Sequence, residues 1–325
     1  MATYADVIIV GGGPAGSTCA WKLQKSGVDC LLLDKQEFPR PKPCGGWLMP
    51  EVLEDLEIDI REYPHNLMSF DRYHVHFKYV NLCLKSLQFA IQRYDFDDWL
   101  LKRSAATVIN HKVAHIREDS GYYVIDGSYK CRYLIGAGGT NCPVYRTFFK
   151  SVNPRAGELQ AVTLVEEFPY ACTDENLHLW FSLNLLPGYA WYVPKCKGIV
   201  NVGIGTLTPR LQKNNDSIKN EWQRFIKKVA DLSLVSDYQY NPRGYVYYLR
   251  SNVEVGRFGN AFVVGDAAGL ATRDMAEGIG PAVKSGLLAA EAITSNKKYD
   301  ISLIKKYSSG NRLLNRVTEY FLSDT

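Results

Sequence analysis

The chain has 325 residues, of which 46% are hydrophobic, so it can build two lobes around a substantial core, and intrinsic disorder is not expected. Its formal net charge is +4, with lysines and arginines scattered along the chain, which argues against nucleic acid as a partner. The longest apolar stretches have the length of strands, well below the roughly 20 residues of a membrane-spanning helix, so we expect no transmembrane segment.

The N-terminus lacks a basic region followed by an apolar segment, so we expect no signal peptide and a cytoplasmic location, with peripheral membrane contact left open. The 8 cysteines form no C-x-x-C pair and no zinc-type Cys/His cluster, which predicts reduced thiols. His74 and His76 alternate on one face of a predicted strand. No third ligand is evident nearby, so a solvated strand face is preferred to a metal site.

A strand, a helix and a second strand are predicted within the first 34 residues. Residues 6–10 form a continuous apolar run, and apolar residues then recur at helical spacing up to Gly27. A second apolar run, residues 30–34, ends in Asp34. This is the pattern of a βαβ unit with a buried parallel sheet.

Three glycines lie between the first strand and its helix. Gly11 suits the tight turn, Gly13 allows the backbone to approach a pyrophosphate, and Gly16 allows the helix to pack closely on the strand. The helix N-terminus then faces the phosphates, and Asp34 can accept hydrogen bonds from ribose hydroxyls. The sequence predicts a site for the ADP part of a dinucleotide, but this fingerprint alone leaves FAD and NAD both open.

The middle of the chain predicts a meander and a second, antiparallel sheet. Three short strands between residues 113 and 137 are separated by Asp-Ser-Gly and Asp-Gly-Ser turns. Further strands are predicted around residues 158–168, 177–184, 188–194 and 199–206. An amphipathic helix over 217–235 is expected to cover that sheet rather than to lie on a membrane.

The C-terminal part returns the chain to the first lobe. An apolar strand at 261–264 runs into a turn containing Gly265 and Asp266, which is suited to the ribityl chain and second phosphate of a longer cofactor. A helix from about Pro281, after Gly278 and Ile279, would direct its positive end at the flavin pyrimidine. These distant segments favour FAD.

Together these motifs resemble the geranylgeranyl reductase family, flavoproteins with the p-hydroxybenzoate hydroxylase fold. The resemblance is carried by GGGPAGS at 11–17, DKQEFPRPKPCGG at 34–46, RYDFDDWL at 93–100, GAGGTNCPVYR at 136–146, PGYAWYVP at 187–194 and GDAAG…EGI from 265 to 279. It implies an α/β fold with a Rossmann-like FAD-binding domain and a second lobe on an antiparallel sheet. We expect the FAD-binding domain to comprise residues 1–60, 90–155 and 255–325, and the substrate-binding lobe residues 61–89 and 156–254.

The resemblance also implies roles for individual residues. Arg93 is expected to touch the cofactor, Asp266 to bind its ribityl-phosphate region, and Cys44 to lie beside the flavin ring near the reacting substrate. A thiol among glycines that only packs is the alternative for Cys44. The full set of predicted FAD-binding residues is Gly11, Gly13, Pro14, Ala15, Gly16, Asp34, Lys35, Cys44, Gly45, Arg93, Gly265, Asp266, Gly278 and Ile279.

Substrate residues and departures from the family pattern lie in the later motifs. Tyr189 and Trp191 match an aromatic element that lines the family's substrate cavity, although ordinary core packing is the alternative. Gly138 replaces an acid, Ala276 replaces a glycine, and Arg273 takes a place usually held by proline. Arg273 is a candidate for stabilising reduced flavin or binding an acidic substrate group, with a plain surface arginine as the alternative.

The resemblance implies a reductase that transfers hydride from reduced FAD to a C=C bond of a hydrophobic isoprenoid, with Cys44 as the catalytic proton donor. The alternatives are an FAD-dependent monooxygenase or halogenase acting on an aromatic substrate, and a non-catalytic prenyl-binding protein. Without a second G-x-G-x-x-G motif, NAD(P)H would act as a transient reductant. Ferredoxin is equally open, so the electron donor stays undetermined.

Overall fold

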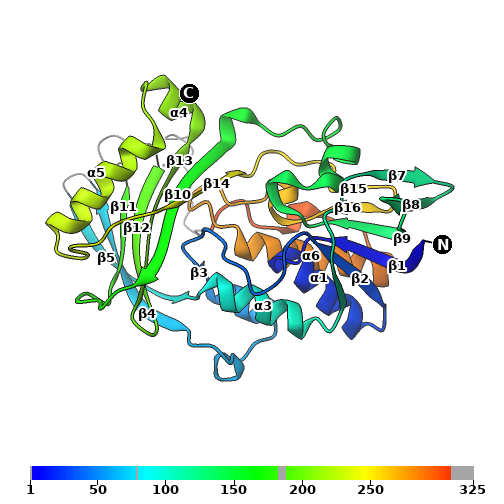
Figure 1. Cartoon of the computed structure of the whole chain (residues 1–325), viewed down its shortest axis with the longest axis horizontal. Coiled ribbons are helices and arrows are strands. Elements are labelled where there is room, and N and C mark those ends of the chain that lie inside the picture. Colours follow the sequence, from blue (N-terminus) through cyan, green and yellow to red (C-terminus); the bar gives the residue numbers. More distant parts are fainter. Residues whose placement is uncertain (1, 78–79, 182–187, 309–325) are drawn as a thin grey trace. The chain divides into compact units, whose positions relative to one another are not determined.

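A computed structural model describes residues 2–77, 80–181 and 188–308, drawn in Figure 1. The described chain divides into two compact units, the first of residues 2–40, 94–156 and 247–308 and the second of 41–93 and 157–246. Relative to the predicted boundaries, residues 41–60 and 90–93 lie in the second unit, and residues 156 and 247–254 lie in the first. Within the described ranges, no helix combines the length and apolar character needed to cross a bilayer.

The first unit is built on a mainly parallel sheet with the strand order β15-β16-β9-β1-β2-β6. Its strands are β1 (Thr3–Val10), β2 (Cys30–Asp34), β6 (Thr107–Asn110), β7 (Ile116–Asp119), β8 (Tyr122–Ile125), β9 (Tyr129–Gly136), β15 (Arg257–Phe258) and β16 (Ala261–Val263). The predicted meander corresponds to β7, β8 and β9. However, β9 also runs parallel to β1 and β16, so the last strand of the meander is a central strand of the sheet.

Two long helices, α1 (Pro14–Lys25) and α6 (Ile279–Thr294), lie side by side in this unit (Figure 1). Their close approach depends on small residues, since a Cβ atom on Gly286 would lie 2.4 Å from the carbonyl oxygen of Ala15. The helix α6 begins two residues before the predicted start at Pro281, because proline fits the first turn as well as the first position. The other helical elements here are α3 (Arg93–Arg103), η2 (Gly139–Asn141), η3 (Tyr145–Phe149), η6 (Gly265–Ala268) and η7 (Ile301–Leu303).

The second unit contains a sheet with the order β14-β10-β13-β12-β11-β4-β5-β3. Its strands are β3 (Trp47–Leu48), β4 (Met68–Phe77), β5 (Val80–Ala90), β10 (Gln160–Pro169), β11 (Leu177–Phe181), β12 (Gly188–Lys195), β13 (Ile199–Leu207) and β14 (Arg243–Tyr248). The sheet is mostly antiparallel, as predicted, and β4 and β11 form a parallel pair within it. These strands are far apart in sequence, so no short hairpin imposes antiparallel pairing on them. The predicted strand at 177–184 extends into residues outside the described ranges.

The helix α5 (Ile218–Asp231) covers one face of this sheet, as its amphipathic pattern predicts. It begins after Ser217, whose hydroxyl accepts a hydrogen bond from the Asn220 N–H. Trp222 and Phe225 are fully buried with Val202 in one apolar cluster. Smaller helical elements are α2 (Pro50–Asp55), η1 (Ile60–Glu62), η4 (Gly157–Leu159) and α4 (Thr208–Lys213).

Candidate functional site

The glycine turn between β1 and α1 has the geometry that its spacing predicts. Gly11 has a φ of +115°, and a Cβ atom there would lie 2.4 Å from the Ala137 carbonyl oxygen. A Cβ atom on Gly16 would lie 1.9 Å from the carbonyl oxygen of Gly11. Only glycine therefore fits at these two positions, and its absence of a side chain brings α1 directly onto the end of β1.

The N-terminus of α1 has no side-chain cap and no negative charge in its first turn. Its cap residue, Gly13, contributes no side-chain hydrogen bond, and the first turn, which includes the buried Pro14 and Ala15, carries no acidic residue. The first-turn N–H groups, which have no intrahelical acceptor, and the helix dipole give positive potential there. The guanidinium of Arg40 adds to it, since its Nη2 lies 3.5 Å from the place a Cβ on Gly13 would occupy.

Sequence reasoning missed Arg40, whose only signal was its place within the 34–46 motif. Its Nη2 lies 3.5 Å from a carboxylate oxygen of Asp97, a side chain fully removed from solvent. This pairing holds the guanidinium in place beside the glycine turn. Arginine is suited to phosphate because its planar group can donate two parallel hydrogen bonds.

Asp34 lies at the end of β2 and is buried, with only 8% of its surface exposed. One carboxylate oxygen accepts a hydrogen bond from the Gly12 N–H at 2.6 Å, and the other accepts from the Gln36 N–H at 2.9 Å. The carboxylate thus stabilises the glycine turn, and its remaining lone pairs can accept further hydrogen bonds. Its neighbour Lys35 is exposed.

The turn at Gly265 and Asp266, far along the chain, packs against the start of α1 in the structure. A Cβ atom on Gly265, whose φ is +57°, would lie 3.2 Å from the Ala15 side chain. The N–H of Gly265 donates to the Ser285 hydroxyl at 2.9 Å. Asp266 follows, with Oδ1 at 3.4 Å from the Cβ position of Gly278, so these residues form one cluster at the start of α6.

The N-terminus of α6 differs from that of α1, because the Glu277 carboxylate is bound there. Glu277 accepts a hydrogen bond from the Gly280 N–H, two residues beyond the cap residue Gly278 and one beyond Ile279. Ala276 adopts a φ of +50° in the left-handed region, where the family pattern has glycine. Gly138, the other small departure, has an ordinary φ of −75°.

Cys44, Gly45 and Trp191 come together in the second unit. A Cβ atom on Gly45 would lie 3.2 Å from Trp191 Nε1, and Cys44 is half-buried with its Sγ accepting from the Gly46 N–H at 3.4 Å. The rings of Tyr189 and Trp191 lie 5.6 Å apart. Two of the three predicted substrate residues, Tyr189 and Trp191, therefore lie on the same sheet face as the cysteine segment.

Two predicted arginines remain. Arg93 begins α3 and is buried, with 8% of its surface exposed. Arg273 is half-buried, and its backbone N–H donates to the Lys306 carbonyl at 3.0 Å.

Four of the other cysteines, Cys19, Cys30, Cys131 and Cys142, are buried. All 8 are free, as predicted. Burial raises the pKa of the Cys30 and Cys131 thiols to about 12, so they stay protonated and pack as small apolar groups. Cys44 differs from Cys30 and Cys131 in its partial exposure, which it shares with Cys172 and Cys196.

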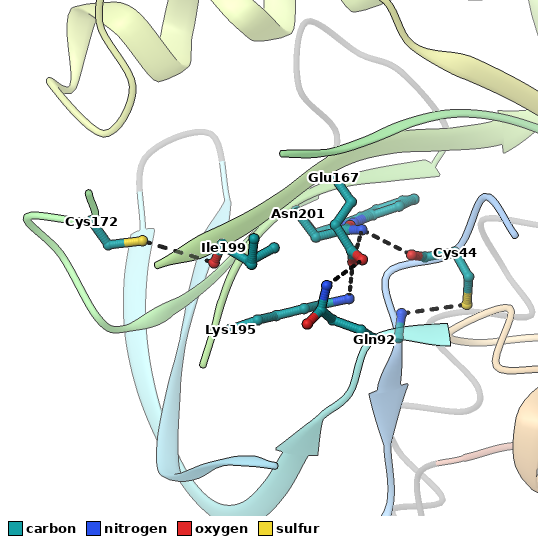
Figure 2. A network of polar contacts seen from close by, with 9 residues as sticks. Cys44, Gln92, Glu167, Cys172, Lys195, Ile199 and Asn201 are labelled. Atoms are coloured by element: carbon teal, nitrogen blue, oxygen red, sulfur yellow. Dashed lines mark hydrogen bonds and ion pairs between the residues drawn. The ribbon is translucent and has the colours of Figure 1, made fainter. Parts of the chain in front are cut away.

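A polar network surrounds the Cys44 segment (Figure 2). Asn201 donates from Nδ2 to the Cys44 carbonyl at 2.9 Å and to Glu167 Oε2 at 3.0 Å, and Glu167 forms an ion pair with Lys195. Trp191 donates from Nε1 to Asn201 Oδ1 at 2.8 Å. Sequence reasoning missed Glu167, Lys195 and Asn201, because only strand register brings them together.

His74 and His76 are half-buried, so their strand face is only partly solvated. The register of β4 and β11 places His178 directly opposite His74, and His76 Nε2 lies 2.9 Å from His178 Nδ1. The rings of His74 and His178 stack at 5.0 Å. Among the residues that the structure describes, no three metal-ligating side chains are grouped to hold an ion.

Comparison with known proteins places these features in a family. Residues 9–81 match the model of an NAD(P)-binding Rossmann-like domain, and residues 164–236 match that of the geranylgeranyl reductase catalytic domain. An uncharacterized protein of Methanosarcina barkeri is 32% identical over 309 residues, covering 91% of this chain and 76% of its own length. A digeranylgeranylglycerophospholipid reductase of Thermoplasma acidophilum is 29% identical over 343 residues, covering 94% and 83%.

Solved structures agree on the fold. A geranylgeranyl bacteriochlorophyll reductase-like protein of Thermoplasma acidophilum superimposes with a TM-score of 0.79 at 22% identity, covering 99% of this chain and 89% of the other. The flavin-dependent brominase Bmp2 superimposes with a TM-score of 0.69 at 17% identity, covering 98% and 84%. The first unit joins two glycine turns, and in the second unit a cysteine-glycine segment packs against an aromatic sheet face. These features and the matches lead to one conclusion. The chain belongs to the geranylgeranyl reductase-like family of FAD-dependent oxidoreductases.

Proposed function

We propose that the chain binds FAD, with the pyrophosphate at the N-terminus of α1. The residues fit the group, since the α1 cap has no side-chain partner and Arg40 lies beside Gly13. Asp34 would hold the ADP ribose, and Asp266 with Gly265, Gly278 and Ile279 the ribityl-phosphate region. Lys35, Cys44, Gly45 and Arg93 complete the proposed set. The first unit would then be the nucleotide-binding domain and the second the substrate-binding lobe.

The reaction we propose is reduction of C=C bonds in a hydrophobic isoprenoid substrate. The observation that carries it is the match of residues 164–236 to the geranylgeranyl reductase catalytic domain. This segment supplies Trp191, against which the Cys44–Gly45 segment packs. When bound, the flavin would supply a hydride equivalent to one carbon of the double bond.

The protein's own part would be to exclude water, to orient the apolar chain and to deliver a proton. Tyr189 and Trp191 offer adjacent rings for the substrate. Cys44 is the proposed proton donor, because this half-buried residue precedes Gly45, which packs against Trp191. The electron donor, NAD(P)H or ferredoxin, is left open by the chain.

The test is anaerobic turnover of the purified, FAD-loaded protein. Chemically reduced protein is mixed with a geranylgeranyl lipid, and mass spectrometry is used to detect the gain of two hydrogen atoms per reduced bond. We expect the wild type to give this gain and Cys44→Ser to slow it by on the order of 100-fold, the usual contribution of a general acid.

Two results would replace this proposal. Oxygen-dependent hydroxylation or halogenation of an aromatic compound, with no reduction of prenyl chains, would make the protein a monooxygenase or halogenase like other proteins of this fold. A protein that takes up no FAD but retains a prenyl lipid would be a non-catalytic binding protein.

A further inference from the structure

Three adjacent strands place four polar side chains on one face of the second unit's sheet. Glu167 of β10 lies directly opposite Asn201 of β13. Asn201 in turn lies opposite Val193 of β12, so Trp191 and Lys195, each two residues from Val193, point to the same side. Strand register therefore brings together Glu167, Lys195 and Asn201, which Figure 2 shows beside Cys44.

The orientation of the Asn201 amide follows from its neighbours. The indole N–H of Trp191 can only donate, so the atom it meets at 2.8 Å must be the amide oxygen. The amide nitrogen then faces two acceptors, the Cys44 carbonyl at 2.9 Å and Glu167 Oε2 at 3.0 Å. Each of its two N–H groups has a partner, and the reverse orientation would lose all three hydrogen bonds.

The acceptor on the far side of Asn201 is itself fixed. Glu167 is paired with Lys195, whose side chain is 1% exposed, and Gln92 Nε2 lies 3.5 Å from the other oxygen of Glu167. A Cβ atom on Gly46 would lie 2.6 Å from Lys195 Nζ and 2.1 Å from the Ile91 carbonyl oxygen. The 44–46 segment is thus held against a rigid polar support.

We propose that Asn201 is a positioning residue for Cys44. Its amide ties the cysteine's own carbonyl to the Glu167–Lys195 pair and to Trp191, which fixes where the thiol stands relative to the aromatic face. Proton delivery to carbon demands such fixed geometry, because a small displacement of the acid removes it from reach. The inference rests on the proposed function of Cys44, but the tether itself can be tested without turnover.

The first test is alkylation of Cys44 by iodoacetamide in Asn201→Asp, followed by peptide mass spectrometry. The carboxylate has the shape of the amide but no donor, so it would oppose both the Cys44 carbonyl and Glu167. We expect the alkylation rate of Cys44 to rise about tenfold relative to that of exposed Cys83, which serves as an internal reference, because the segment opens more often. Asn201→Ser, which removes the amide without adding charge, provides a second variant if the first fails to fold.

The matched control is Tyr192→Phe. This change also removes a buried hydrogen bond from β12, here from the tyrosine hydroxyl to the Asp174 carbonyl at 3.0 Å, but on the opposite face of the sheet. We expect it to leave the Cys44-to-Cys83 rate ratio unchanged. Equal ratios in the Asn201 variants and in Tyr192→Phe would overturn the positioning role.

Turnover separates this inference from the proposed function. In an active reductase, the Asn201 variants should lower kcat with little change in KM, whereas Tyr192→Phe should change neither. A KM effect alone would overturn the positioning role. An altered ratio in a protein that reduces no prenyl double bond would leave the tether standing and refute the proposed reaction.

Discussion

At the scale of single residues, the imidazole of His178 has the most unusual surroundings among the histidines. One ring nitrogen is hydrogen-bonded to His76 at 2.9 Å and the other to Asp174 at 3.1 Å. The other ring nitrogen of His76 is hydrogen-bonded to Asn81 at 2.8 Å. His74 stacks on it from the neighbouring strand. Burial lowers the pKa of His178, while the Asp174 carboxylate opposes that shift and the other two imidazoles reinforce it.

This environment predicts that stability falls with acidification. Because the folded pKa lies below the unfolded value of about 6.5, the unfolded chain binds more protons as the pH drops, which favours unfolding. We expect the urea midpoint to decline from about pH 7 downward until the folded pKa is passed, and His178→Gln to flatten this decline. Exposed His115→Gln is the control and should follow the wild type. A His178 variant with an unchanged pH profile would contradict the assignment.

At the scale of elements, the contact between α1 and α6 is set by one missing side chain. Gly286 lies within α6, where alanine would gain about 1 kcal/mol of helix propensity. However, a Cβ there would lie 2.4 Å from the Ala15 carbonyl oxygen and 3.1 Å from the Cys19 nitrogen, both backbone atoms. We therefore expect Gly286→Ala to lower the free energy of unfolding by about 1 to 3 kcal/mol.

Thermal melts of Gly286→Ala and Gly157→Ala provide the comparison. Gly157 has no heavy atom within 4 Å of its Cβ position and a non-positive φ, so its replacement should stay within about 0.5 kcal/mol of the wild type. Equal stability of the two variants would show that the helices can move apart without cost.

Elements were predictable from the sequence wherever the signal was local. The apolar runs and the glycine turn predict β1, α1 and β2. Ser217 and the apolar periodicity that follows it predict α5. The parallel pairing of β4 with β11 and the double role of β9 were not predictable, because both depend on partners far along the chain. The same limit hid the Asn201 network, which exists only once β10, β12 and β13 are in register.

At the scale of the whole molecule, the sequence predicts a nucleotide-binding part built from separate segments of the chain. The apolar strand before Gly265 needs a parallel partner in the sheet of the first unit. In the structure this strand is β16, and it pairs with β9. Residues 41–60 were harder to assign, because β3 is only two residues long and its place beside β5 has no local signature. The 34–46 motif in consequence ends in a different unit from the one in which it begins.

The proposed cofactor predicts a stability linkage for the molecule. A ligand that binds only the folded chain stabilises it by RT ln(1 + [L]/Kd), about 2.7 kcal/mol at a hundredfold excess over Kd. We expect removal of FAD to lower Tm, and added FAD to restore it in a concentration-dependent manner. Asp34→Ala should weaken this response, because it removes both the proposed ribose acceptor and the brace on the Gly12 N–H.

The control for this measurement is Asp119→Ala, a change to a carboxylate at the end of β7 that bonds Arg117 and Ser120. It should shift Tm slightly and leave the FAD dependence intact, since it lies outside both glycine turns. Loss of the flavin response in Asp34→Ala alone would locate the ADP half of the cofactor at the end of β2. If added FAD left the Tm of the wild type unchanged, cofactor binding would be contradicted, whatever the variants do.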